Sequence, residues 1–167
     1  KGGANYNFNE HHNAFFNVGY ISRAPKFNYG AFLSFASSNV TNPDAKNEKV
    51  VSFELGYGYR LKWLQVDVNA YWTKWLDKTM AKSSTVGTAQ VDAFVNMTGV
   101  NALHKGIEIE AKASPLYWLD VNAMFSIGDW KWDSNAKGYV FDYNGQPLTK
   151  DGSIASGIGA EDHLSTG

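Results

Sequence analysis

Apolar and polar residues alternate one by one along this chain, and this pattern constrains the fold more strongly than any other feature. In the clearest run, residues 51–61, every odd-numbered position is apolar or aromatic, and the even-numbered positions carry Ser, Glu, Gly, Gly and Arg. Runs of the same kind lie at 6–8, 16–21, 64–73, 107–113 and 119–127. Because a period of two places successive side chains on opposite faces of a strand, the sequence predicts an all-β fold of about six antiparallel amphipathic strands.

The connections between these runs differ sharply in length. Short ones are expected at about 9–13, 62–63 and 114–117, and long polar ones at about 24–49, 76–103 and 133–167. If successive strands pair antiparallel, the short and long connections fall at opposite ends of the sheet. Outer-membrane barrels show this asymmetry, with short periplasmic turns and long extracellular loops. The pattern therefore favours a transmembrane β-barrel over a soluble β-meander.

The tryptophans lie at two levels along the expected strands. Two are at the short turns and four near the long connections, about nine to twelve residues away, which spans about 25 Å for tilted strands. This matches the two aromatic girdles that flank the apolar band of a membrane barrel. The alternative is that these rings pack the core of a β-sandwich. The expected girdle residues are Trp63, Trp72, Trp75, Trp118 and Trp130.

Composition and motifs give no support to catalysis or nucleic-acid binding. The chain has no cysteine and a formal net charge of −1, so thiol chemistry and a basic nucleic-acid surface are not expected. His11 and His12 have no ligand-spaced partners, and paired carboxylates at Glu108 and Glu110 fit a solvated strand face better than acid–base chemistry. We expect no enzyme activity, no metal and no cofactor. Aromatic residues in the long connections could instead form a stacking platform for a sugar or a siderophore, or could equally pack the loops on one another: Phe27, Tyr29, Phe32, Phe35, Tyr139, Phe141 and Tyr143.

Four motifs, in order along residues 6–132, resemble those of TonB-dependent outer-membrane receptors. The segment 22–27 contains R-A-P, and the segment 42–49 is similar to N-P-x-L-K-P-E, with Ala45 and Asn47 in place of Leu and Pro. The strand 53–60 reads E-L-G-x-x-Y-R after its first residue, and the segment 96–111 contains G-x-E-x-E. The resemblance implies a barrel of about 22 strands around an N-terminal plug. This chain would be an internal fragment of that barrel.

The resemblance also implies a function and partners. Such a receptor lies in the outer membrane of a Gram-negative bacterium, here of Bacteroidetes-like style, and imports a scarce ligand with energy from TonB. Siderophore-iron, haem, cobalamin and a glycan all remain candidates, although residues 26–42 contain no histidine, which makes haem less expected. The expected partners are outer-membrane lipid, the TonB complex through the plug, the ligand and a surface lipoprotein, and not nucleic acid.

In a barrel, strand alternation assigns side chains to the lumen or to lipid. The expected lumen- or plug-facing residues are Arg23, Glu54, Arg60, Asp67, Glu108 and Glu110. The expected lipid-facing residues are Val51, Phe53, Leu55, Tyr57, Tyr59, Val66, Val68, Ile107, Ile109, Val121 and Phe125. A soluble all-β carbohydrate- or ligand-binding module, the main alternative, requires a second sheet over the Phe53 face. A small closed porin-like barrel is a third possibility.

Overall fold

The computed structural model describes residues 1–33, 40–157 and 162–164. The elements in this part of the chain are strands, which confirms the all-β prediction. They are β1 (Gly2–Asn7), β2 (His12–Arg23), β3 (Glu48–Arg60), β4 (Leu64–Val86), β5 (Val91–Leu116), β6 (Leu119–Trp132), β7 (Ala136–Phe141) and β8 (Asp162–Leu164). No helix with the length and apolar character needed to cross a membrane occurs among the described residues.

The chain forms two compact units. Unit 1 comprises residues 1–21, 50–74 and 103–131, and unit 2 comprises residues 22–49, 75–102 and 132–167. The strands β2 to β6 each contribute residues to both units.

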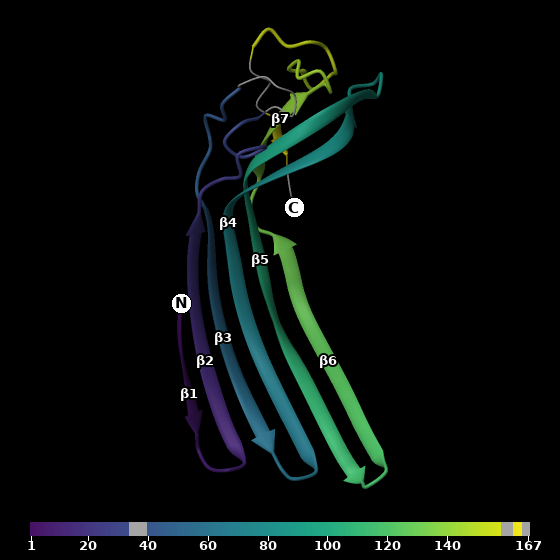
Figure 1. The fold of residues 1–167 in the computed structure, drawn as a ribbon. Coiled ribbons are helices and arrows are strands. Elements are labelled where there is room, and N and C mark those ends of the chain that lie inside the picture. Colours follow the sequence, from purple (N-terminus) through teal and green to yellow (C-terminus); the bar gives the residue numbers. More distant parts are fainter. Residues whose placement is uncertain (34–39, 158–161, 165–167) are drawn as a thin grey trace. The chain divides into compact units, whose positions relative to one another are not determined.

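Unit 1 is a sheet in which β1 to β6 lie side by side in chain order, with neighbouring strands running in opposite directions (Figure 1). The β1–β2 pair is antiparallel, with a register from Gly2 opposite Val18 to Asn7 opposite Asn13. The turns that join β1 to β2, β3 to β4 and β5 to β6 lie at one end of this sheet (Figure 1). The interruptions of the period predicted turns at about 9–13, 62–63 and 114–117, whereas the structure has them at 8–11, 61–63 and 117–118.

The β4–β5 connection is much shorter than expected. A long loop was predicted at 76–103, but β4 continues to Val86 and β5 begins at Val91. The turn between them is tight, with positive φ angles at Gly87 and Gln90. The Thr- and Ser-rich composition is that of a loop, yet these residues extend a hairpin because β5 also pairs with β7 there and buries Ala93 and Val95.

Unit 2 holds the buried hydrophobic core among the described residues. One cluster joins Ala93, Val95, Val140 and Leu148, and a second joins Leu33, Tyr139 and Phe141. Strand β7 pairs antiparallel with β5, from Phe94 opposite Phe141 to Thr98 opposite Lys137, and β8 pairs antiparallel with β7. Much of this core comes from segments that were expected to be loops.

Candidate functional site

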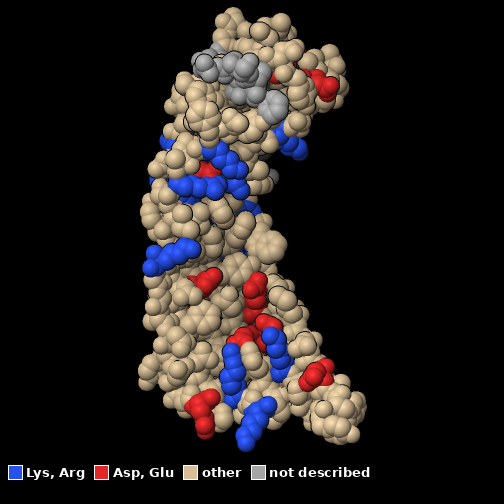
Figure 2. Space-filling model, in the orientation of Figure 1, with Lys and Arg blue, Asp and Glu red and all other residues tan. Residues whose placement is uncertain are grey.

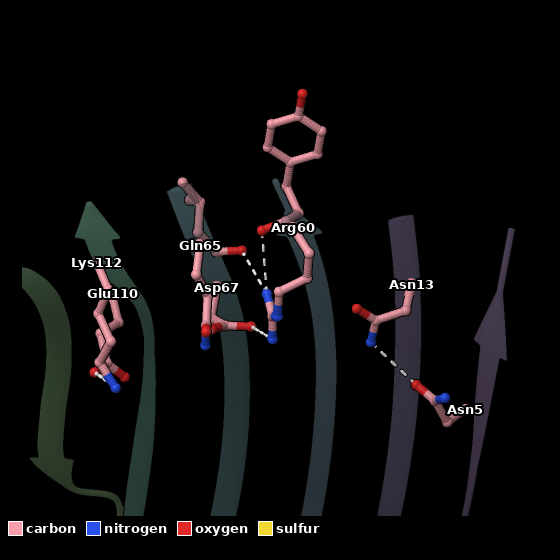
Figure 3. Close-up of polar contacts among 9 residues, drawn as sticks. Asn5, Asn13, Arg60, Gln65, Asp67, Glu110 and Lys112 are labelled. Atoms are coloured by element: carbon pink, nitrogen blue, oxygen red, sulfur yellow. Dashed lines mark hydrogen bonds and ion pairs between the residues drawn. The ribbon is translucent and has the colours of Figure 1, made fainter. Parts of the chain in front are cut away.

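One face of unit 1 carries a row of polar side chains across five strands, and we call it the polar face (Figure 3). Asn13 Nδ2 on β2 donates to Asn5 Oδ1 on β1 at 3.1 Å. Arg60 at the end of β3 donates from Nη2 to Asp67 Oδ1 on β4 at 2.6 Å. The row continues on β5, where Lys112 Nζ lies 3.0 Å from a carboxylate oxygen of Glu110. Most of these charges are thus neutralised by a neighbour on the same face.

The predicted lumen-facing residues of unit 1 share this polar face. Glu54 accepts a hydrogen bond from Asn17 at 3.2 Å, and Gln65 donates to the free oxygen of Asp67 at 2.9 Å. Glu108 lies two positions before Glu110 on β5, so it points to the same side. Figure 2 shows the acidic and basic side chains of this sheet gathered in its half toward the short turns. The sequence therefore identified a common face, and its contact with a lumen stays a prediction.

The opposite face of unit 1, which we call the apolar face, leaves large side chains uncovered. Leu55 is 62% exposed and Phe125 is 59% exposed, values that a folded soluble domain seldom shows for a contiguous set of such residues. All eight strands belong to one sheet, and no second sheet is present in the described part of the chain. Of the predicted lipid-facing residues, those that are exposed are Phe53, Leu55, Tyr57, Ile107, Ile109, Val121 and Phe125, and those that are half-buried are Val51, Tyr59, Val66 and Val68.

Aromatic rings cluster at the short-turn end of unit 1. Trp63 and Trp118 lie in the β3–β4 and β5–β6 turns and are exposed, and the Trp63 carbonyl accepts the Ser114 amide at 2.8 Å. On the apolar face, the His12 ring is hydrogen-bonded to the Tyr57 hydroxyl. Such amphipathic rings, apolar at one side and polar at the tip, are the residues that favour a membrane–water interface.

The structure places Trp130 on the polar face, whereas Trp72 lies on the apolar face of β4. Its Nε1 donates to the Tyr71 hydroxyl at 2.8 Å, and its ring lies 6.2 Å from the His104 ring. Gly106 and Gly128 make room for the Tyr71 side chain there, because a Cβ atom at either position would meet its hydroxyl group. The girdle prediction used only the position of Trp130 along its strand, which does not determine the face. In unit 2, Lys78 Nζ lies over the Trp75 ring, 5.2 Å from the ring centroid.

The segments 22–27 and 42–49 meet in unit 2 through an ion pair between half-exposed Arg23 and buried Glu48, which we call the clamp. Arg23 Nε donates to Glu48 Oε2 at 2.7 Å, and Arg23 Nη2 donates to the same oxygen. The other oxygen, Oε1, accepts the Thr79 amide at 3.2 Å and the Thr79 hydroxyl at 3.3 Å. Burial alone would raise the pKa of Glu48, but the Arg23 and Thr79 hydrogen bonds outweigh it and hold that pKa below its ordinary value. Arg23 was expected to face the lumen or plug, and in the described residues its guanidinium binds Glu48.

Asp44 of the N-P-D segment anchors the same loop to β7. Its carboxylate accepts a hydrogen bond from the Tyr139 hydroxyl and contacts Lys137 Nζ at 3.0 and 3.1 Å. The Tyr139 hydrogen bond and the Lys137 contact lower the pKa of Asp44. Asn42, two residues before Asp44, ties this loop to Gly30, because its Nδ2 donates to the Gly30 carbonyl at 2.8 Å. Glu48 and Asp44 were missed as site residues, although their motif was recognised in the sequence.

A polar pocket of about 260 Å³ opens beside this anchor in unit 2. Its lining combines Asp44 and Lys137 with Lys46, Asp77 and Asn135. Asp77 lies 3.7 Å from Lys49 Nζ and Asp44 is bound by Lys137, so both carboxylates have a cation beside them. The described residues contain no group of three metal-ligating side chains. The pocket can therefore offer hydrogen bonds to a polar ligand, and it shows no nucleophile–base pair.

Long antiparallel strands with one polar face and one exposed apolar face define the wall of a transmembrane β-barrel. The family model described as TonB dependent receptor-like, beta-barrel matches residues 1–161, and the chain belongs to this family. No curated protein and no solved structure matches the chain. The family comprises transporters and receptors of the Gram-negative outer membrane rather than enzymes, which confirms the resemblance read from the four motifs.

Proposed function

We propose that this chain forms part of the wall of an active transporter that imports a scarce ligand through the outer membrane with energy from TonB. The single observation that carries the proposal is the pairing of a polar, internally neutralised face with an exposed apolar face on the same six strands. In this assignment the apolar face contacts lipid, and the polar face lines a lumen and meets water, the plug or the ligand. The short turns then lie on the periplasmic side and the long connections are extracellular.

In this proposal unit 2, which contains the long connections, makes the first contact with the ligand. Its polar pocket offers amide, hydroxyl and carboxylate groups, which suit a hydroxyl-rich or chelating ligand such as a glycan or a siderophore. Phe27 and Tyr143 are exposed. The ring of Phe27 packs on Phe32 at 4.7 Å. Siderophore-iron, haem, cobalamin and a glycan stay open as ligand classes.

Most loop aromatics serve packing rather than an open sugar platform. Tyr139 and Phe141 are buried in the core of unit 2, and the Tyr29 ring packs against Phe94 at 5.0 Å. Phe35 lies outside the described residues. The exposed Phe53 side of unit 1 has no second sheet over it in the described chain, as the soluble module would require. These two observations favour the transporter over the carbohydrate-binding module.

A pair of neighbouring positions on β6 tests the face assignment. Phe125 lies on the apolar face and Ser126 on the polar face, and both are exposed. In the full receptor folded into lipid vesicles, we expect Phe125→Lys to lower the free energy of unfolding by about 2–4 kcal/mol relative to Phe125→Ala. Ser126→Lys should change it by less than about 1 kcal/mol relative to Ser126→Ala, because its ammonium group reaches water in the lumen.

The measurement is urea unfolding of the vesicle-bound receptor, followed by tryptophan fluorescence and by heat-modifiable mobility on a gel. Equal costs at positions 125 and 126, or a larger cost at 126, would reject the proposed orientation. A receptor that stays folded and soluble without detergent would reject the membrane assignment itself. Growth on iron chelates, cobalamin or glycans as sole sources, with and without an intact TonB system, then tests energised import and its ligand.

A further inference from the structure

A shallow depression of about 590 Å³ lies over β5 in unit 1, bordered by β4 and β6. Its side walls are Trp72 from β4, Ile107 from β5 and Ile127 from β6, and the backbone of Gly106 and Gly128 forms its floor. The volume is that of a typical small-molecule site, about 300–1,000 Å³. None of these residues takes part in the charged row of the polar face.

The depression exists because the largest side chain beside it turns away. The Trp72 indole packs on Phe53 of β3, with ring centroids 5.7 Å apart and planes inclined at 48°. The ring therefore leans toward β3 and leaves β5 uncovered on the apolar face. Ile107 and Ile127 remain 45% and 62% exposed as a result.

One end of this depression, which we also call the apolar trough, is cationic. Lys105 and Ile107 lie on the same face of β5 by alternation, as do Ile127, Asp129 and Lys131 on β6. Lys105 Nζ is 3.4 Å from Asp129 Oδ2, and both side chains are about half exposed, 49% and 53%. Two cations thus stand against one carboxylate at this end. An apolar trough that ends in excess positive charge complements an amphiphile with an anionic head.

The position of the trough fits a lipid better than a soluble ligand. Trp72, at its edge, belongs to the ring of tryptophans expected at the level of lipid headgroups, where lysines reach phosphate. A zwitterionic lipid brings its own cation close to the phosphate and gains less from Lys105 than a lipid with a net negative charge. We infer that the depression binds an anionic membrane lipid with a phosphate headgroup, with an acyl chain along Trp72 and Ile127 and the phosphate on Lys105. This inference rests on the proposed membrane function.

The test uses the full receptor that contains this segment, purified in mild detergent. It is titrated with dibrominated phosphatidylglycerol, which quenches tryptophan fluorescence on contact, and in parallel with dibrominated phosphatidylcholine. We expect tighter binding of phosphatidylglycerol. Lys105→Gln should weaken it about fivefold, the equivalent of about 1 kcal/mol for one lysine near a headgroup, and should leave phosphatidylcholine unchanged.

Three further variants separate a lipid site from an ordinary ion pair. Lys112→Gln, on the polar face of the same strand, is the matched control and should bind both lipids like the wild type. Asp129→Asn should tighten phosphatidylglycerol binding, because the carboxylate competes with the phosphate for Lys105. Ile127→Phe fills the trough and should weaken both lipids.

Several outcomes would overturn the inference. They are equal affinity for the two lipids, equal effects of Lys105→Gln and Lys112→Gln, weaker phosphatidylglycerol binding in Asp129→Asn, and displacement of the lipid by inorganic phosphate. Failure of the proposed function is distinguishable, since it would appear as a receptor that does not form a heat-modifiable barrel in detergent. A folded, heat-modifiable barrel with no lipid preference would reject the lipid site alone.

Discussion

Removing the arginine of the clamp should loosen unit 2 more than removing the glutamate. Glu48 is 2% exposed, and Arg23 donates both hydrogen bonds that reach its Oε2 atom. Arg23→Gln therefore leaves a buried carboxylate oxygen without its donors, while Oε1 keeps its two bonds from Thr79. Glu48→Gln leaves no buried charge. The two variants break the same contact with different electrostatic consequences.

The cost can be worked from these contacts. Removing one partner of a fully buried ion pair costs about 3–5 kcal/mol. Arg23 is half exposed at 53%, so water can reach the vacated side, and Thr79 retains part of the stabilisation. We expect about 2 kcal/mol for Arg23→Gln and about 1 kcal/mol for Glu48→Gln, and the double variant should recover part of the Arg23→Gln loss.

The Thr79 amide is a direct probe, because it donates to the same carboxylate. A loss of about 2 kcal/mol corresponds to about 30-fold faster exchange if the amide exchanges through local opening of the clamp. Hydrogen-exchange mass spectrometry of the folded receptor, on peptides spanning 40–49 and 76–86, measures this. Equal exchange rates in Arg23→Gln and Glu48→Gln would refute the argument that an uncompensated buried charge sets the cost.

Three other perturbations act at single positions. The pKa of Asp44 is lowered in the folded chain, so its contacts stabilise unit 2 fully at pH values above its ordinary pKa of 3.8, and this stabilisation is lost as the pH falls through the lowered pKa. Proteolysis of residues 40–47 should therefore rise in acid for the wild type, and it should depend less on pH for Asp44→Asn. Gly106→Ala places a Cβ 2.6 Å from a backbone oxygen of β6 and should destabilise unit 1 by about 1–3 kcal/mol in urea unfolding, whereas Gly2→Ala, with nothing within 4 Å, should not. Asn96 is fully buried and donates to the Leu33 carbonyl, so Asn96→Asp should cost more than about 3 kcal/mol, read as faster exchange of residues 91–98; exchange no faster than the wild type would contradict this.

The strands of unit 1 could be predicted because alternation reports directly on a two-faced sheet. Residues 51–61 alternate without exception, and β3 follows them to Arg60 with the expected side chains on each face. The same signal found the short turns, since an interruption of the period marks where a strand reverses. The long hairpin past Leu76 was missed because polar Thr and Ser side chains hide the alternation, although the backbone pairing continues.

For the site, the sequence of each strand predicts which face a side chain lies on, but it does not predict which residue of another strand or loop that side chain binds. Strand parity placed Arg60 and Asp67 on one face, and the structure adds that they bind each other at 2.6 Å across two strands. The partner of Arg23 could not be found in this way, because Glu48 lies 25 residues away and the loop that returns it has no period. Trp130 shows a second limit: its position along the strand could be predicted, but that position does not determine which face of the sheet carries its side chain.

The two units draw their stability from different sources. Unit 2 buries Leu33, Phe141 and the carboxylate of Glu48, which is paired with the half-exposed guanidinium of Arg23. Unit 1 leaves Leu55 and Phe125 exposed and has the ladder hydrogen bonds of its sheet as its main internal contacts. Those hydrogen bonds are strongest where water is excluded, and exposed apolar side chains carry no cost there. A sheet with this distribution of side chains is unfavourable in water, and this is the physical reason for proposing that its apolar face contacts hydrocarbon.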